Sequence, residues 1–374
     1  MVLYSLPTVE DCASFSNTVE PYINEFWELP VSIITRVGVF IRGQDGPTLL
    51  DSYVNTNPLV LGFALSLLMG CIFFVVSEFN GNYSQVDRCW SLLPTLYIAH
   101  FNLWSRLSGR LSRRLDVVLF SSIVWSARLT YNYARKGGYS VGSEDYRWAI
   151  VKKNIPAWSF RLLNLTFISF IQSVLLLALA APAYTILLAS DIEQSMTAAD
   201  WAFASVEIGL VIVQWFSDGQ QWNYQSAKRQ YQQSAKVPAG FTRAAMDRGF
   251  IAEGLWGYSR HPNFAAEQAI WLVLYQWSCY ATSSLYNWAG VGSAGLVMLF
   301  QSSTWLTESI TSGKYPEYKE YQKKVGTFVP TSTTAYTASV GHPQVIRASE
   351  LARRPQEKAA KSSGIQTRGS AEKR

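Results

Sequence analysis

The sequence predicts an all-α protein, a multi-pass membrane helical bundle of about seven transmembrane helices. Its composition is the first reason: hydrophobic residues make up 49% of the 374 residues and charged residues only 16%. That is too apolar for a soluble protein of several domains. The second reason is that several apolar runs reach the length of about 17–25 residues that a helix needs to cross a bilayer.

These runs follow one another along the chain and divide it into three parts. The strongest are Pro58–Val76, Leu115–Tyr131, Phe160–Ala189 and Trp201–Phe216, and the more polar ones are Arg88–Trp104, Phe264–Tyr280 and Trp288–Leu306. Val31–Ile41 is too short to cross, so we expect residues 1–57 to be a lumenal or interfacial segment. Residues 58–330 form the membrane domain. Residues 331–374 have few large apolar side chains, which predicts a disordered basic tail.

Charge indicates an orientation. The loops Arg135–Arg161 and Lys228–Arg260 are both basic and two predicted spans separate them, so both should face the cytosol, as should the C-terminus. The arginines between Arg106 and Arg114 disagree with this assignment. We expect an integral protein of the endoplasmic reticulum membrane, without a secretory signal peptide.

Other observations exclude whole classes of function. The four cysteines lack the spacing of metal ligands, so we expect no metal site; they are Cys12, Cys71, Cys89 and Cys279. No basic face is interleaved with aromatic residues, so we expect no nucleic-acid partner. The partners that remain are membrane lipid and a lipophilic small molecule.

The stretch GLWGYSRHPNFAAEQAIWLVLYQW, residues 254–277, joins polar residues to a predicted span. Pro262 suits the first turn of a helix, which predicts a helix start near His261, with free amides beside Arg260. Such an end suits a phosphate or carboxylate, and Glu267 follows one turn after Asn263 on the same face. A nucleotide site is one interpretation. The other is a helix cap, with the arginine reaching lipid headgroups and a buried, protonated glutamate.

Tyr-Ser-Arg-His-Pro-Asn-Phe followed by Glu267 resembles the C-terminal signature of the steroid 5-alpha-reductase and sterol-reductase superfamily, in particular its DUF1295 branch of membrane proteins. Phe264 departs from that signature, which usually has a tyrosine there. The resemblance covers roughly residues 58–330. Further segments match the branch in order: Asp87 with Trp90, Trp125 with Arg128 and Leu129, EDYR from Glu144, SDGQQWNY from Ser217, and KYPEYKEYQKKVGTFVP from Lys314.

The resemblance implies a steroid 5-alpha-reductase-like fold that uses NADPH to reduce a carbon–carbon double bond in a lipophilic substrate, such as a sterol, isoprenoid or acyl chain. The same signature occurs in isoprenylcysteine carboxyl methyltransferases, so a methyltransferase that uses S-adenosylmethionine is an alternative. A non-catalytic lipid-binding or scaffold protein is another. Six cations from Lys228 to Arg260 favour NADPH, because S-adenosylmethionine has no phosphate. The expected cofactor-binding residues are Asp218, Tyr224, Arg229, Arg243, Arg260, His261, Asn263 and Glu267.

A reductase of this kind also needs a group that delivers a proton. The superfamily's donors lie in the early helices, which here offer Asp87, Tyr97 and Glu78. Asp87 is the first choice and Tyr97 the second, because a continuous helix would place both on the face that carries Trp90. Tyr97 can also be read as an interfacial anchor. Glu207, in the fifth predicted span, is interpreted as a group that pairs with another or lies at the interface.

Overall fold

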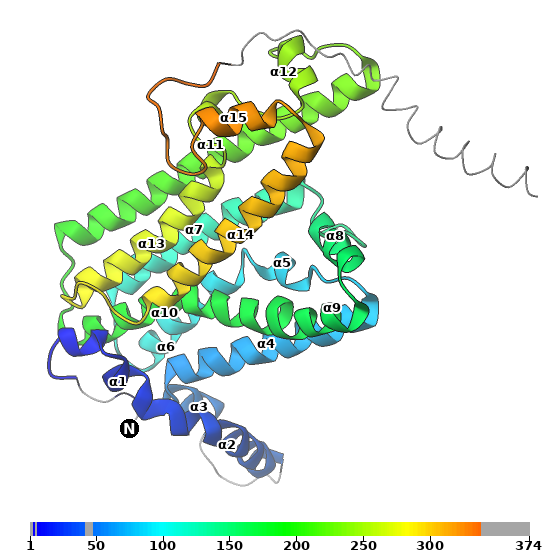
Figure 1. The fold of residues 1–374 in the computed structure, drawn as a ribbon. Helices are drawn as coiled ribbons and strands as arrows, with labels where there is room; N and C mark the ends of the chain where they lie inside the picture. The colour runs from blue at the N-terminus through cyan, green and yellow to red at the C-terminus, as the bar shows by residue number, and fades with distance from the viewer. Residues whose placement is uncertain (1–2, 4–5, 42–47, 338–374) are drawn as a thin grey trace, which may run out of the picture. The chain divides into compact units, whose positions relative to one another are not determined.

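The computed structural model describes residues 3, 6–41 and 48–337, and within that part of the chain it is helical, without strands (Figure 1). It divides into two compact units. The first unit holds Met1–Trp215 and Phe264–Thr304, and the second holds Phe216–Asn263 and Trp305–Arg374. Each unit has its own hydrophobic core. Helices α11 (Ala198–Ser234), α13 (Pro262–Ala281) and α14 (Gly290–Lys314) contribute residues to both.

The other helices of the first unit come mostly before α11. They are η1 (Glu10–Ala13), α1 (Phe15–Thr18), η2 (Glu20–Tyr22), α2 (Ile23–Ile41), α3 (Leu49–Val54), α4 (Pro58–Asn80), α5 (Gln85–Cys89), α6 (Leu93–Leu107), α7 (Arg113–Arg135), α8 (Tyr146–Asn154), α9 (Ala157–Leu163), the π-helical segment η3 (Asn164–Ile171) and α10 (Gln172–Ile192). The second unit adds α12 (Arg243–Arg248), η4 (Gly254–Gly257) and α15 (Tyr318–Lys324).

Local signals explain where α4 begins and ends. The side chain of Asn57 accepts a hydrogen bond from Leu59 N at 2.8 Å, and Pro58 occupies the first turn, where its missing N–H is not needed. Gly81 closes the helix in the left-handed conformation that glycine adopts at low cost. The predicted span Pro58–Val76 lies within this helix.

Helix α10 forms the centre of the first unit. Every residue from Leu179 to Ser190 is buried, as expected for a helix that is apolar on all sides and enclosed by others. It packs against α4, α6 and α7, and Figure 1 shows its continuation through η3 and α9 running beside α4. This packing fixes α7, which carries Trp125 and Arg128 of the site in the first unit.

Three described helical segments are long and apolar enough to cross a membrane, which is consistent with a membrane protein: α4, Ala157–Ile192 and α11. This number is fewer than the seven predicted. Helix α6 has 15 residues and so is about 22 Å long, shorter than a hydrocarbon core of about 30 Å. Charged residues interrupt α7. Helices α13 and α14 are long enough, but Trp, Tyr, Gln and Ser lower their apolar character.

Described residues near both ends of the chain make packing contacts. In the first unit, Trp288 Nε1 donates to Thr18 Oγ1 at 2.9 Å. Residues 331–337 are also packed: Tyr336 N donates to Gly257 O at 2.9 Å, and its ring lies 5.1 Å from that of Tyr321. A single aromatic residue in a polar stretch therefore anchors the start of the predicted tail. Residues 338–374 lie outside the described part of the chain.

Replacing Gly292 tests the packing of the first unit. A Cβ atom at Gly292 in α14 would lie 2.2 Å from Ala178 O in α10, so Gly292→Ala must push the two helices apart. We expect a loss of about 1–3 kcal/mol, seen as a lower melting temperature of the detergent-solubilised protein. Gly209→Ala in α11 is the matched control, because nothing lies within 4 Å of its Cβ position and alanine favours the helix. An unchanged melting temperature for Gly292→Ala would contradict this packing.

Candidate functional site

In the first unit, a buried carboxylate lies where α7, α11 and α13 meet. Trp125 Nε1 donates to Glu267 Oε1 at 3.0 Å and to Oε2 at 3.1 Å, and Trp271 Nε1 donates to Oε1 at 3.1 Å. Arg128 and Gln214 donate to Oε2 at 3.1 and 2.6 Å. Arg128 also donates to Gln214 Oε1 at 2.6 Å. These five residues are the Glu267 cluster.

The cluster compensates for the burial of a charge. A carboxylate removed from water is tolerated only with a paired cation and hydrogen bonds to both oxygens, and Glu267 has both. The sequence pointed to Trp125 and Arg128 through the family motif, and no motif pointed to Gln214. A polar residue within an apolar run was the available signal. Because its donors occupy both oxygens, Glu267 acts here as a fixed anchor for the two indoles and the guanidinium.

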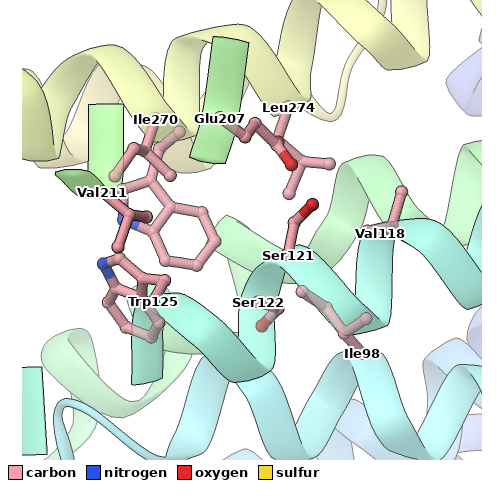
Figure 2. A pocket seen from close by; sticks show the side chains of 10 residues that line it. Ile98, Val118, Ser121, Ser122, Trp125, Glu207, Val211, Ile270 and Leu274 are labelled. Atoms are coloured by element: carbon pink, nitrogen blue, oxygen red, sulfur yellow. The ribbon is translucent and has the colours of Figure 1, made fainter. Parts of the chain in front are cut away.

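A small cavity lies next to the cluster, and we call it the inner cavity (Figure 2). It has about 20 Å³ of free volume, which is the space of about one water molecule. Trp125 and Trp271 form part of its wall, and Glu207, Ser121 and Ser122 are its polar lining residues. The predicted alternatives for Glu207 were pairing or an interfacial position, but it is buried here and lies against this cavity.

The two predicted proton donors lie on different helices. Asp87 is on α5, and Tyr97 is on α6 after a turn through residues 90–92, so they do not share the face of one continuous helix. Pro94 in the first turn of α6 favours that break. Tyr97 is fully buried, and its hydroxyl has no hydrogen-bond partner among the described residues. Trp148 Nε1 donates to Asp87 Oδ2 at 3.2 Å, and burial raises the pKa of Asp87.

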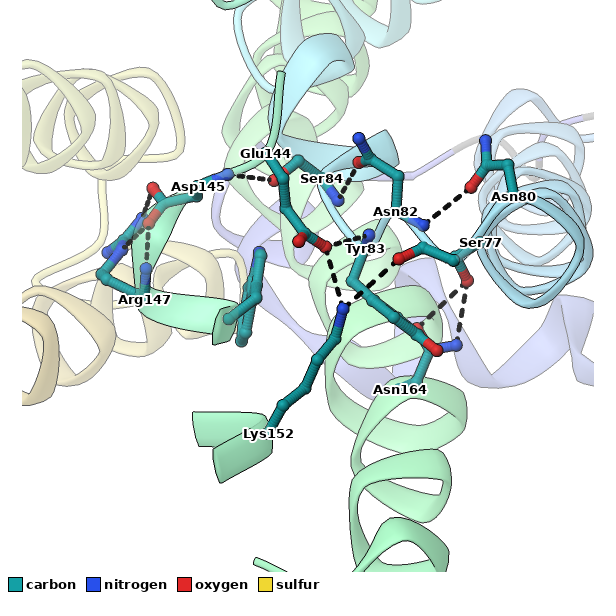
Figure 3. Close-up of polar contacts among 12 residues, drawn as sticks. Ser77, Asn80, Asn82, Tyr83, Ser84, Glu144, Asp145, Arg147, Lys152 and Asn164 are labelled. Carbon is teal, nitrogen blue, oxygen red and sulfur yellow. Dashed lines mark hydrogen bonds and ion pairs between the residues drawn. The ribbon is translucent and has the colours of Figure 1, made fainter. Parts of the chain in front are cut away.

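A polar network holds the loop that precedes α5, the helix of Asp87 (Figure 3). Glu144 Oε1 accepts from Tyr83 N at 2.8 Å and from Lys152 Nζ at 3.3 Å, and Asp145 N donates to Ser84 Oγ at 2.9 Å. The EDYR segment therefore ties the loop after α4 to the start of α8. Glu78, the third candidate donor, lies in an ion pair with Arg161 at 3.1 Å instead.

In the second unit, α13 begins at Pro262 as predicted, but Arg260 is not exposed to solvent. Its guanidinium forms an ion pair with Glu308, with Nε 2.6 Å from Oε1 and Nη2 3.1 Å from Oε2. It also donates to the main-chain oxygens of Gln322 and Val325 and to Thr327 Oγ1. All five of its N–H groups are thus used within the unit. Arg260 joins the signature to the closing segment and does not present a free cation.

Glu308 is the centre of this second buried arrangement. His261 Nε2 lies 2.9 Å from Oε1, and Gln322 Nε2 donates to Oε2 at 2.8 Å. Burial by itself would raise the pKa of Glu308, but the hydrogen bonds from His261, Arg260 and Gln322 outweigh it and lower that pKa to about 2. The carboxylate therefore stays ionised at neutral pH.

Of the remaining residues predicted to bind the cofactor, some are buried and others are exposed to solvent. Asp218 and Tyr224 are buried: Asn263 Nδ2 donates to Asp218 Oδ1 at 3.1 Å, and Tyr224 Oη donates to Ala245 O at 2.8 Å. Arg229 and Arg243 are exposed, and the second is 3.6 Å from an Asp247 oxygen. Seven of the eight predicted residues belong to the second unit, and Glu267 belongs to the first.

Comparison with known proteins places the chain in a family. Residues 73–325 match the family described as protein of unknown function, DUF1295. A protein of Schizosaccharomyces pombe described as uncharacterized is 39% identical over 331 residues, which cover 88% of this chain and 92% of that protein. No solved structure matches. The matched residues take in the Glu267 cluster, Asp87 and the Arg260 pair, and the chain belongs to the DUF1295 family.

Proposed function

We propose that this protein is a membrane-embedded, NADPH-dependent reductase of a carbon–carbon double bond in a sterol, isoprenoid or acyl substrate. The observation that carries the proposal is that some cations of the second unit are held in ion pairs, whereas others are exposed. Arg248 is buried and Arg260 is partly buried, and they form ion pairs with Glu253 and Glu308. Arg229, Lys236 and Arg243 are exposed, and exposed cations are what the phosphates of a dinucleotide require.

The resemblance of the signature to sterol reductases supplies the reaction class. When bound, NADPH would provide the hydride. The chain would hold the phosphates with Arg229 and Arg243, and Trp222 supports Arg229 with its ring 5.5 Å from the guanidinium carbon. The hydrogen-bonded pair of Asp218, which is buried, and Asn263 would help to shape the surface beside these arginines. The proposal also includes the seven-span arrangement and the endoplasmic reticulum location expected above.

Asp87 is our proposed proton donor. A general acid must hold its proton near the working pH, and burial moves the pKa of this carboxyl in that direction. Among the described residues, the side chains that form hydrogen bonds with Asp87 are Trp148, through Nε1, and Ser84, so Asp87 has fewer donors than the four around Glu267. Tyr97, with its buried and unpartnered hydroxyl, is the second candidate.

The cofactor can be identified by thermal shift of the full-length solubilised protein. NADPH should raise the melting temperature, because a ligand that binds only the folded state stabilises it. NADH should do so less, because it lacks one phosphate, and S-adenosylmethionine should have no effect. The double variant Arg229→Gln with Arg243→Gln should weaken NADPH binding by at least roughly 10-fold, on the scale of charge-assisted hydrogen bonds. Lys319→Gln, an exposed change on α15 of the same unit, is the control.

Two other results would redirect the assignment. Stabilisation by S-adenosylmethionine alone would overturn the reductase and favour the methyltransferase. Stabilisation by none of the three, in a preparation shown to be folded, would favour a scaffold or lipid-binding protein.

Substitution of Asp87 tests the chemical step. Asp87→Asn keeps the size of the side chain and its contact with Trp148, so the shift with NADPH should persist. NADPH consumption should fall roughly 100-fold or more, the scale of a lost general acid. The assay uses reconstituted protein with an unsaturated sterol, a polyprenol and an enoyl thioester as probes. Asp116→Asn, in an exposed pair with Arg106, is the control. Full turnover by Asp87→Asn would move the role to Tyr97.

A further inference from the structure

The inner cavity contains a carboxyl group that neither the fold nor the proposed reaction uses. Glu207 lies on α11, within a helix apolar enough to cross a membrane, and is only 4% exposed. No ion pair reaches it within the described residues, in contrast to Glu267. A buried carboxyl without a cation is costly, and such groups in apolar segments commonly mark binding sites.

A hydroxyl without a hydrogen-bond partner among the described residues lines the same cavity. Figure 2 shows the Ser121 hydroxyl on α7 and the Glu207 carboxyl turned toward each other across the cavity. Ser121 is 4% exposed, and although it lies near Glu207, its oxygen has no partner at hydrogen-bond geometry. The free volume of about 20 Å³ leaves room for one oxygen-sized group in the cavity that both side chains line.

An open groove adjoins the cavity on the side of α7 and α11, and we call it the outer groove. Its free volume is about 350 Å³, within the range of small-molecule sites. It is lined by Val124, Ala127, Arg128, Val211, Ile212 and Trp215. Val211 also lines the inner cavity, so one valine side chain borders both spaces. The groove is apolar except at Arg128, and therefore suits a hydrocarbon chain or ring system.

We propose that the outer groove and the inner cavity form one lipid-binding site, in which a lipophilic molecule places a single uncharged oxygen, a hydroxyl or a carbonyl, in the inner cavity within reach of Glu207 and Ser121. A protonated carboxyl and a hydroxyl can each donate a hydrogen bond to such an oxygen. A ligand carboxylate does not fit, because no cation lines the inner cavity. The site goes beyond the proposed function, because it binds such a lipid whether or not the protein is a reductase.

Four probes of equal chain length test this selectivity: hexadecanol, a long-chain methyl ketone, hexadecane and palmitate. Apparent Kd values come from the dependence of the melting temperature of the full-length protein on probe concentration. We expect the alcohol and the ketone to bind about 2- to 10-fold more tightly than the alkane, the scale of one hydrogen bond. Palmitate should bind at least about 10-fold more weakly than the alcohol. Equal binding of alcohol and alkane, or tightest binding of palmitate, would overturn the proposal.

Substitutions then locate the oxygen. Ser121→Ala should weaken alcohol binding about 2- to 10-fold, and Glu207→Leu should abolish the preference for alcohol over alkane. Glu207→Gln keeps a donor and an acceptor and should retain that preference. Ser205→Ala, on an exposed position of α11, is the matched control. If Glu207→Leu still binds the alcohol more tightly than the alkane, the assignment is contradicted. If Glu207→Leu fails to fold, the same preference is compared between Ser121→Ala, where it should fall, and Glu207→Gln, where it should persist.

These measurements separate the two proposals. Tighter binding of the alcohol and ketone without any stabilisation by NADPH would support this lipid-binding site and contradict the proposed reductase function. Stabilisation by NADPH with no selectivity among the four probes would do the reverse.

Discussion

The first unit depends on one interaction, the burial of the Glu267 carboxylate among donors from α7, α11 and α13. An ion at this depth costs several kcal/mol unless it is fully paired, so each donor must stay where it is. Trp125 and Trp271 are therefore held edge to face, with ring centroids 4.9 Å apart and planes at 82°. Because these indoles point their N–H groups at Glu267, their rings are fixed as a wall of the inner cavity. The position of this cavity wall therefore depends on the hydrogen bonds that compensate the buried charge of Glu267.

The second unit also depends on a buried carboxylate that accepts hydrogen bonds from several side chains, here that of Glu308. Glu308 gathers Arg260, His261, Tyr318 and Gln322, which brings the signature and the closing segment together. The most recognisable residues of the signature are thus used in holding its own backbone, and this constrains where a ligand can bind. A phosphate would compete with Glu308 for Arg260 and would leave a buried carboxylate unpaired. The exposed arginines carry no such cost, which is why we assign the phosphates to them.

Sequence patterns predicted those features that local chemistry decides. Pro262 indicated the start of α13 correctly, because a proline in the first turn restricts the backbone through its own ring. The partner of Arg260 was not predictable, since Glu308 lies 48 residues away and only the fold brings them together. The same limit applies to Gln214 in the Glu267 cluster. The prediction that Asp87 and Tyr97 share a helix face was wrong, because it treated residues 90–92, which form a turn, as part of one continuous helix.

The number of donors around each acid separates structural from chemical roles. Glu267 accepts from four side chains and Glu308 from Arg260, Gln322, Tyr318 and His261, so their oxygens are occupied. Asp87 has one indole at hydrogen-bond distance, and Glu207 faces a hydroxyl that has no partner. An acid can bind or protonate a ligand only through oxygens that the fold leaves available, because breaking a buried network costs more than a new hydrogen bond returns. Of these four acids, Asp87 and Glu207 have the fewest donors, and ligand chemistry is therefore least costly there: a proton at Asp87 and an oxygen of a bound lipid at Glu207.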